Sequence, residues 1–164
     1  MAVRQASFLG LCVPSGAGPS VWLRASALGL ALGLVLSGAA PAQAMSQQAA
    51  NEMLRGDERI WGGLLHAGIV AHIVAECDSI DGPSRLVQNA FFLSLYNQAR
   101  RLGASRAQIE AFVEDEAEKA RLEGEVRRYI ESTGARPDDP ASVCALGRAE
   151  IDARSPVGRR LNER

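Results

Sequence analysis

The stretch DERIWGGLLHAGIVAHIVAEC, residues 57–77, does most to decide the fold. Its large apolar residues recur every three or four positions, as on one face of an α-helix. Asp57 can cap the free amides at the start of this helix. A second stripe, at four-residue spacing, consists of small residues: Gly63, Ala67, Ala71 and Ala75. Because another helix can approach such a stripe closely, we predict that this helix is buried and central.

A second helix is expected after the turn at residues 78–82, with Pro83 at its first position and Gly103 after its end. Its apolar face is unusually wide and comprises Leu86, Val87, Ala90, Phe91, Leu93, Ser94, Leu95 and Ala99. We expect this face to pack in the core.

Two further helices complete the prediction. Ser105 and Gln108 have the spacing of a capping box, which predicts a third helix that Gly124 could bend or interrupt. Asp139 caps and Pro140 opens a fourth helix, which extends to about Ala153. A short turn follows, and no segment shows the alternation of a strand. The predicted fold is an all-α protein, a small bundle of four main helices plus a short C-terminal helical turn.

Residues 1–44 have the order of a secretory signal peptide. Arg24 precedes the uncharged apolar run at residues 25–38, and Ala42, Gln43 and Ala44 resemble a peptidase site. We predict export by the general secretory route, cleavage after Ala44 and a periplasmic location. The membrane is then contacted only through the signal peptide. An uncleaved anchor is the alternative, and translation could start near Val21.

The mature chain divides into a flexible leader, residues 45–56, and a helical domain, residues 57–164. The leader is polar and short, so we expect it to be poorly ordered at its start.

Two cysteines, Cys77 and Cys144, follow the predicted cleavage site. In an oxidising compartment an even pair in a short domain predicts one disulfide. Two free thiols, reactive or metal-binding, are the alternative. No CxxC motif and no cluster of Cys and His ligands is present in the sequence.

The charge balance argues against nucleic-acid binding. All 19 acidic residues but only 16 of the 18 basic residues follow Ala44, so the mature chain has a net charge of about −3. A nucleic-acid partner would require a basic face. Four arginines nevertheless gather near the C-terminus and are candidate partner-binding residues: Arg154, Arg159, Arg160 and Arg164. An anionic protein or phospholipid headgroups are the partners considered, and solvated surface arginines are the alternative.

The sequence carries no recognisable catalytic, metal or cofactor signature. His66 and His72 are six residues apart and lie on different helix faces, so they do not form a metal pair. The carboxylates Glu114, Asp115, Glu116 and Glu118 are interpreted as a solvated face rather than an acid/base pair. We therefore expect no cofactor and no enzymatic activity.

A family resemblance rests on residues 139–151 (DPASVCALGRAEI), on 155–159 (SPVGR) and on 118–121 (EKAR). These stretches resemble small exported alphaproteobacterial proteins that are defined only as a domain of unknown function. The resemblance implies that the paired cysteines, here Cys77 and Cys144, are a shared feature. It implies no activity.

The sequence thus favours a periplasmic, non-enzymatic interaction or accessory protein that contacts another envelope protein. Two alternatives stay open. Phe91, Phe92, Trp61 and Tyr96 could line a cavity for a small apolar ligand, or could simply fill the core. The protein could also be an enzyme of unfamiliar type. The oligomeric state is not predicted.

Overall fold

The computed structural model describes residues 45–164. Residues 1–44, with the predicted signal peptide and its cleavage site, lie outside the described part of the chain. The elements are α1 (Gln47–Gly56), α2 (Glu58–Glu76), β1 (Ile80–Asp81), α3 (Arg85–Arg101), α4 (Arg106–Glu114), α5 (Glu116–Ser132), α6 (Pro140–Asp152), a 3-10 turn η1 (Gly158–Arg160) and β2 (Asn162–Glu163). The all-α prediction is confirmed, with six helices rather than four over residues 45–164.

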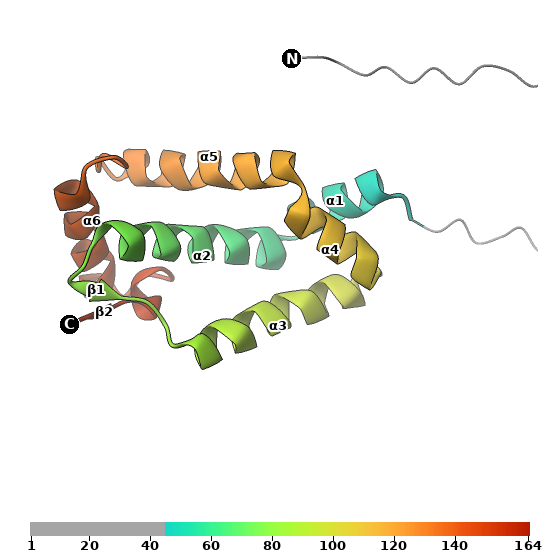
Figure 1. Ribbon diagram of the computed structural model, residues 1–164, viewed down its shortest axis with the longest axis horizontal. Helices are drawn as coiled ribbons and strands as arrows, with labels where there is room; N and C mark the ends of the chain where they lie inside the picture. The colour runs from blue at the N-terminus through green and yellow to red at the C-terminus, as the bar shows by residue number, and fades with distance from the viewer. Residues whose placement is uncertain (1–44) are drawn as a thin grey trace, which may run out of the picture. The chain divides into compact units, whose positions relative to one another are not determined.

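Helix α2 is the centre of the fold, as its sequence predicted. It contacts α1, α3, α5 and α6. Figure 1 shows α2 between α5 and α3, with α6 at the left-hand ends of α2 and α5. Asp57 caps α2, since its Oδ1 accepts a hydrogen bond of 2.9 Å from the Ile60 amide.

The predicted third helix is two helices. The chain breaks at Asp115, whose backbone is extended and whose Oδ1 accepts hydrogen bonds from the amides of Ala117 and Glu118. A carboxylate that caps a new helix ends the preceding one. Gly124, expected to bend or interrupt the helix, lies within α5. The predicted capping box of Ser105 and Gln108 is present at the start of α4.

The prediction of a flexible leader at residues 45–56 is wrong for most of its length. Residues 47–56 form α1, with Ala50 and Leu54 buried. Helix α1 packs against α4 and α2, so its few apolar residues are covered by elements that come later in the chain.

Smaller differences concern the ends of the second helix and the chain's last residues. Ser84 caps α3, so Pro83 lies before the helix rather than at its first position. The C-terminal segment forms η1 as a helical turn, then pairs β2 with β1 in an antiparallel ladder of Ile80 with Glu163 and Asp81 with Asn162. This two-stranded pair was not predicted.

The apolar interior forms two clusters. The first, here called the disulfide core, consists of Ile69, Val70, Ile73, Cys77, Ile80, Val126, Ile130, Val143, Leu146, Val157 and Leu161. The second, the distal core, consists of Leu54, Ile60, Ala99, Ala104, Ile109 and Phe112. Among residues 45–164 no helix has the length and apolar character needed to cross a membrane.

Candidate functional site

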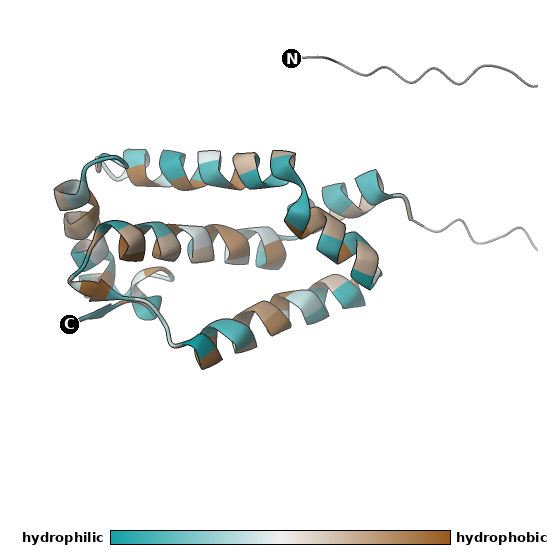
Figure 2. Ribbon diagram, in the orientation of Figure 1, coloured by the Kyte–Doolittle hydropathy of each residue, from teal (hydrophilic) through white to brown (hydrophobic). Residues whose placement is uncertain are grey.

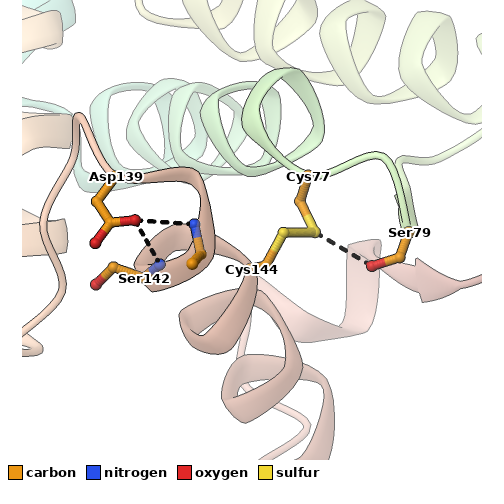
Figure 3. The surroundings of a disulfide bond; sticks show 6 residues. Cys77, Ser79, Asp139, Ser142 and Cys144 are labelled. Atoms are coloured by element: carbon orange, nitrogen blue, oxygen red, sulfur yellow. Dashed lines mark hydrogen bonds between the residues drawn. A yellow bond between two sulfur atoms is a disulfide. The ribbon is translucent and has the colours of Figure 1, made fainter.

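Two cysteines, Cys77 and Cys144, meet at the end of α2. The Sγ atoms of Cys77 and Cys144 are 2.08 Å apart, the distance of a disulfide bond. Cys77 is fully buried, and Figure 3 shows its sulfur beside the Ser79 hydroxyl, at 3.3 Å. Cys144 lies one turn after the Asp139 cap of α6. The pair therefore fastens α2 to α6 in the centre of the disulfide core.

The four C-terminal arginines, candidates for partner binding, have different surroundings. Arg164 makes a two-pronged contact with Asp81, with N–O distances of 2.7 to 2.9 Å. This contact lowers the pKa of the Asp81 carboxyl. Arg159 donates to the backbone carbonyl of Arg154. Arg160 instead lies over the Phe91 ring, 4.0 Å from its centroid.

An apolar groove lies between α2 and α3, beside Arg160. It has a volume of about 350 Å³, within the range of small-molecule sites. Its α2 side consists of Ala67, Val70, Ala71, Val74 and Ala75. Its other side consists of Gly82, Pro83, Val87, Gln88, Phe91 and Phe92. Arg160 is the one charged residue in this lining.

The groove exists because α3 covers only part of the small-residue stripe on α2. At Gly63 the helices are close, and an added Cβ would lie 3.0 Å from Leu95 and 3.3 Å from Phe91. Farther along, Ala71 and Ala75 are exposed. The sequence predicted close approach along the whole stripe, but the structure shows it at Gly63, with the alanines left as the floor of the groove.

Of the four aromatic residues that could line a cavity, two line the apolar groove. Phe91 and Phe92 belong to the groove. Trp61 packs edge-on against Phe112, with ring centroids 6.3 Å apart, and its indole nitrogen donates to Glu125. Tyr96 also packs against the distal core. These last two residues therefore pack against the distal core, and Tyr96 also lines a separate hollow beside α4.

The wide apolar face of α3 is not buried as expected. Six large hydrophobic residues of the described chain are exposed: Leu86, Val87, Phe92, Leu93, Leu102 and Val113. The first four lie on α3 and Leu102 is its C-cap. Figure 2 shows hydrophobic turns along α3 as well as on the central α2. The width of the face was itself a signal, since one neighbouring helix covers only part of such a surface.

Helix α3 has two apolar sides. Val87 and Phe91 line the groove toward α2. Leu86, Ala90 and Leu93, at i, i+4 and i+7, are exposed and take no part in that lining. At about 100° per residue they form one line on the other side of the helix, here called the outer ridge. Leu86 is 80% exposed and Leu93 58%.

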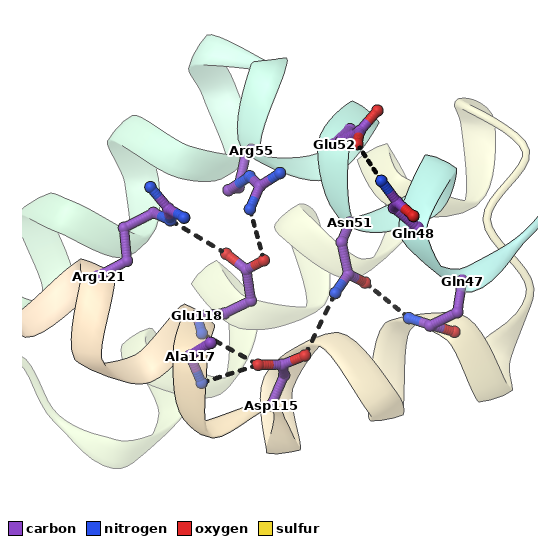
Figure 4. Close-up of polar contacts among 9 residues, drawn as sticks. All are labelled: Gln47, Gln48, Asn51, Glu52, Arg55, Asp115, Ala117, Glu118 and Arg121. Atoms are coloured by element: carbon purple, nitrogen blue, oxygen red, sulfur yellow. Dashed lines mark hydrogen bonds and ion pairs between the residues drawn. The ribbon is translucent and has the colours of Figure 1, made fainter.

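The carboxylates interpreted as a solvated face are partly structural. Glu118 is buried, and its Oε1 lies 2.8 Å from Arg55 of α1. Its Oε2 lies 3.8 Å from Arg121. Figure 4 shows this group beside a second chain of contacts, in which Asp115 accepts from Asn51 and Asn51 accepts from Gln47. These contacts fasten α1 to the start of α5 and account for the order of the supposed leader.

A second buried carboxylate, Glu150, also has structural partners. Its Oε1 accepts a hydrogen bond of 2.5 Å from the Tyr129 hydroxyl, and its Oε2 accepts from Ser155. Burial, followed by this hydrogen bond, raises the pKa of Tyr129 to about 12. The backbone of Glu150 meets Gly158, where an added Cβ would lie 1.8 Å from its carbonyl oxygen. The cluster thus holds η1 against α6.

The two histidines have different surroundings. His72 Nε2 lies 3.0 Å from the Pro137 carbonyl oxygen. His66 lines a second hollow with Arg59 and Arg160, and its pKa is lowered by burial and by Arg160, against a smaller opposing effect of Glu150. Over residues 45–164 no three His, Cys, Asp or Glu side chains are grouped as metal ligands.

The fold and these sites define a small all-α protein with a cysteine pair at disulfide distance and an apolar groove. Residues 52–162 match the family of unknown function DUF5333. Since this match covers more than half of the chain, the protein belongs to that family. Comparison with curated proteins and comparison with solved structures each give no match.

Proposed function

We propose that this member of DUF5333 is an exported, non-enzymatic interaction protein, and that the outer ridge of α3 binds another envelope protein. The observation that carries the proposal is the exposure of Leu86 (80%) and Leu93 (58%) in one line on the side of α3 that takes no part in the groove. Apolar residues gathered in this way mark interaction surfaces more often than singly scattered ones.

The charges of α3 define the chemistry of the partner. The helix contains Arg85, Arg100 and Arg101 and no acidic residue. An amphipathic partner helix with acidic residues beside its apolar stripe would complement both properties. Two copies of this chain paired through the same ridge would bring their arginines together, which disfavours a homodimer at this surface.

Export is supported by two independent features. Residues 1–44 have the composition of a signal peptide, and the distance between Cys77 and Cys144 suits a disulfide, which persists in oxidising compartments. N-terminal sequencing of protein recovered from the periplasm should begin at Met45. Recovery of the intact precursor from the cytosol would contradict export.

The non-enzymatic assignment is supported by the roles of the buried carboxylates. Glu118 holds Arg55, and Glu150 holds Tyr129 and Ser155. Each stabilises a junction between elements.

Photo-crosslinking tests the ridge directly. A photoreactive residue would replace Leu93 in the full chain, and the control would replace Val113, which is exposed to the same extent (59% against 58%) but lies outside α3. We expect an adduct from position 93 alone, with a partner segment that is helical and acidic by mass spectrometry. Charge reversal at Arg85 and Arg101 should reduce it. Equal adducts from both positions, or no adduct, would contradict the proposal.

A small apolar ligand is the second candidate function. It is favoured by the groove of about 350 Å³ and by the two phenylalanines in its wall. Native mass spectrometry of protein purified without detergent should then show a bound mass that Ala71→Trp removes. Identical spectra for both proteins would exclude it.

A further inference from the structure

We infer that the groove between α2 and α3 is a binding site for a long-chain carboxylate, with the alkyl chain along the alanine floor and the head group at Arg160. The inference rests on the second candidate function and names its ligand class.

The shape and chemistry of the groove suit an alkyl chain. Its floor consists of Ala67, Ala71 and Ala75, whose short side chains leave a continuous channel along α2. Val87, Phe91 and Phe92 supply an apolar wall. A chain buried there would gain about 25 cal/mol for each Å² of apolar surface removed from water.

The charge of the groove defines the head group. Arg160 provides its single charge, and no Asp or Glu between residues 45 and 164 forms an ion pair with this guanidinium. The guanidinium carbon lies 4.0 Å from the centroid of the Phe91 ring, and the N–H groups that do not face the ring are available as donors. A guanidinium edge matches the two oxygens of a carboxylate. One cation in the groove corresponds to one negative charge on the ligand.

Arg160 is held in place by its own segment. The neighbouring residues Val157 and Leu161 are buried in the disulfide core. Gly158 lies directly against the backbone of Glu150, which fixes η1 on α6. Because the segment is already fixed, binding a ligand at Arg160 costs less conformational freedom.

Beyond Arg160 a second hollow opens, lined in part by Asp57, Glu58, Arg59 and His66. Asp57 is engaged as the cap of α2 and as the acceptor for Gln98. The groove and this hollow share Phe91 and Arg160, so a head group at Arg160 would face the hollow while the chain lies on the apolar side.

Calorimetric titration of the mature protein, residues 45–164, provides the test. The probes are dodecanoate, dodecyltrimethylammonium and dodecyl maltoside, each below its micelle concentration. We expect dodecanoate to bind best. Arg160→Gln should weaken the affinity for dodecanoate at least about tenfold, since one charged contact is lost. The affinity for the maltoside should be unchanged. Ala71→Trp should abolish binding by filling the channel.

Leu93→Gln is the matched control, since it changes the other side of α3 and should leave dodecanoate affinity unaltered. Thermal unfolding must show that each variant is folded. Equal affinity for the three probes, no effect of Arg160→Gln or Ala71→Trp, or no binding would overturn the inference. Crosslinking from Leu93 that persists in Ala71→Trp would show that the outer ridge functions independently. A protein adduct from position 71 with no dodecanoate binding would identify the groove as a protein interface.

Discussion

The two sides of α2 carry residues of different size and have different surroundings. Toward α5 and α6, Ile69, Ile73 and Cys77 are fully buried in the disulfide core. Toward α3, Ala71 and Ala75 are exposed on the floor of the groove. The first side is closed by large residues and a covalent link. The second has small residues, and within residues 45–164 no helix is seated on them beyond Gly63.

This difference separates the residues that stabilise the fold from the residues that are exposed to a ligand. On the closed side, each large side chain is matched by neighbours from distant parts of the chain, so a change there alters stability. On the open side, a helix diverges from a surface that could accept it, so a change there should alter binding instead. The predictions below test this separation.

The largest expected effect is on the closed side. Replacing both Cys77 and Cys144 by alanine should lower the free energy of unfolding by about 4 kcal/mol, because the cross-link spans 67 residues. Urea denaturation of the oxidised and double-variant proteins measures this loss. A reducing agent should destabilise the wild type and have no effect on the variant. Equal stability of the two proteins would show that the closed side does not depend on its cross-link.

Two glycine substitutions compare a closed with an open environment. A Cβ at Gly147 would lie 2.6 Å from Ile80 and 2.8 Å from Ile73, so Gly147→Ala should destabilise the fold by about 1–3 kcal/mol. A Cβ at Gly62 would meet no described atom within 4 Å beyond its chain neighbours and the backbone of its own helix, so Gly62→Ala should stabilise α2 by up to about 1 kcal/mol. Thermal unfolding checks both signs, and a stabilised Gly147→Ala would contradict the close packing of α6.

The Tyr129 hydroxyl makes the stability of the closed side depend on pH in the alkaline range. Its folded pKa of about 12 exceeds the ordinary tyrosine value of 10.0, so the folded state keeps a proton that the unfolded state loses between these values. The stabilisation is complete below pH 10 and falls as the pH rises toward 12. Tyr129→Phe should remove this dependence and cost about 1 kcal/mol at neutral pH, through the lost hydrogen bond to Glu150. Denaturation curves at several alkaline pH values measure the free energy of unfolding as a function of pH. If this free energy fell with pH in the variant as steeply as in the wild type, groups other than Tyr129 would be responsible.

The smallest expected effect on stability is on the open side. Ala71→Leu should change the free energy of unfolding by no more than about 0.5 kcal/mol, because the position is exposed. It should nevertheless reduce the volume of the groove and weaken dodecanoate binding. Urea denaturation and calorimetry on the same sample measure the two quantities. A large loss of stability would mean that Ala71 is part of the core.

The helices were predictable where the signals that start them are local. Asp57, Ser105 and Asp139 each cap a helix through amides two or three residues away, so sequence alone locates them. Helix α1 was missed because its contacts are distant, as in the pair of Arg55 with Glu118. The helix break at Asp115 was missed because Asp115 stands in a run of acidic residues, where sequence alone does not distinguish a capping carboxylate from its neighbours.

The candidate site was only partly predictable for the same reason. The arginine cluster and the aromatic residues were found by composition, but the stacking of Arg160 on Phe91 joins positions 69 residues apart. The open groove depends on the angle between α2 and α3, which are close at Gly63 and separate toward the C-terminal end of α2. No local sequence pattern encodes this angle. The match of Cys77 with Cys144 was predictable because residues 45–164 contain no other cysteine.

The link between Cys77 and Cys144 also makes a covalent ring from the chain between them. Helices α3, α4 and α5 all lie within this ring. A protease that cuts one exposed loop in the ring, such as the Gly103 turn, would leave a nicked protein that migrates as one piece until it is reduced. Limited digestion could thus sever the backbone beside α3 without releasing either half.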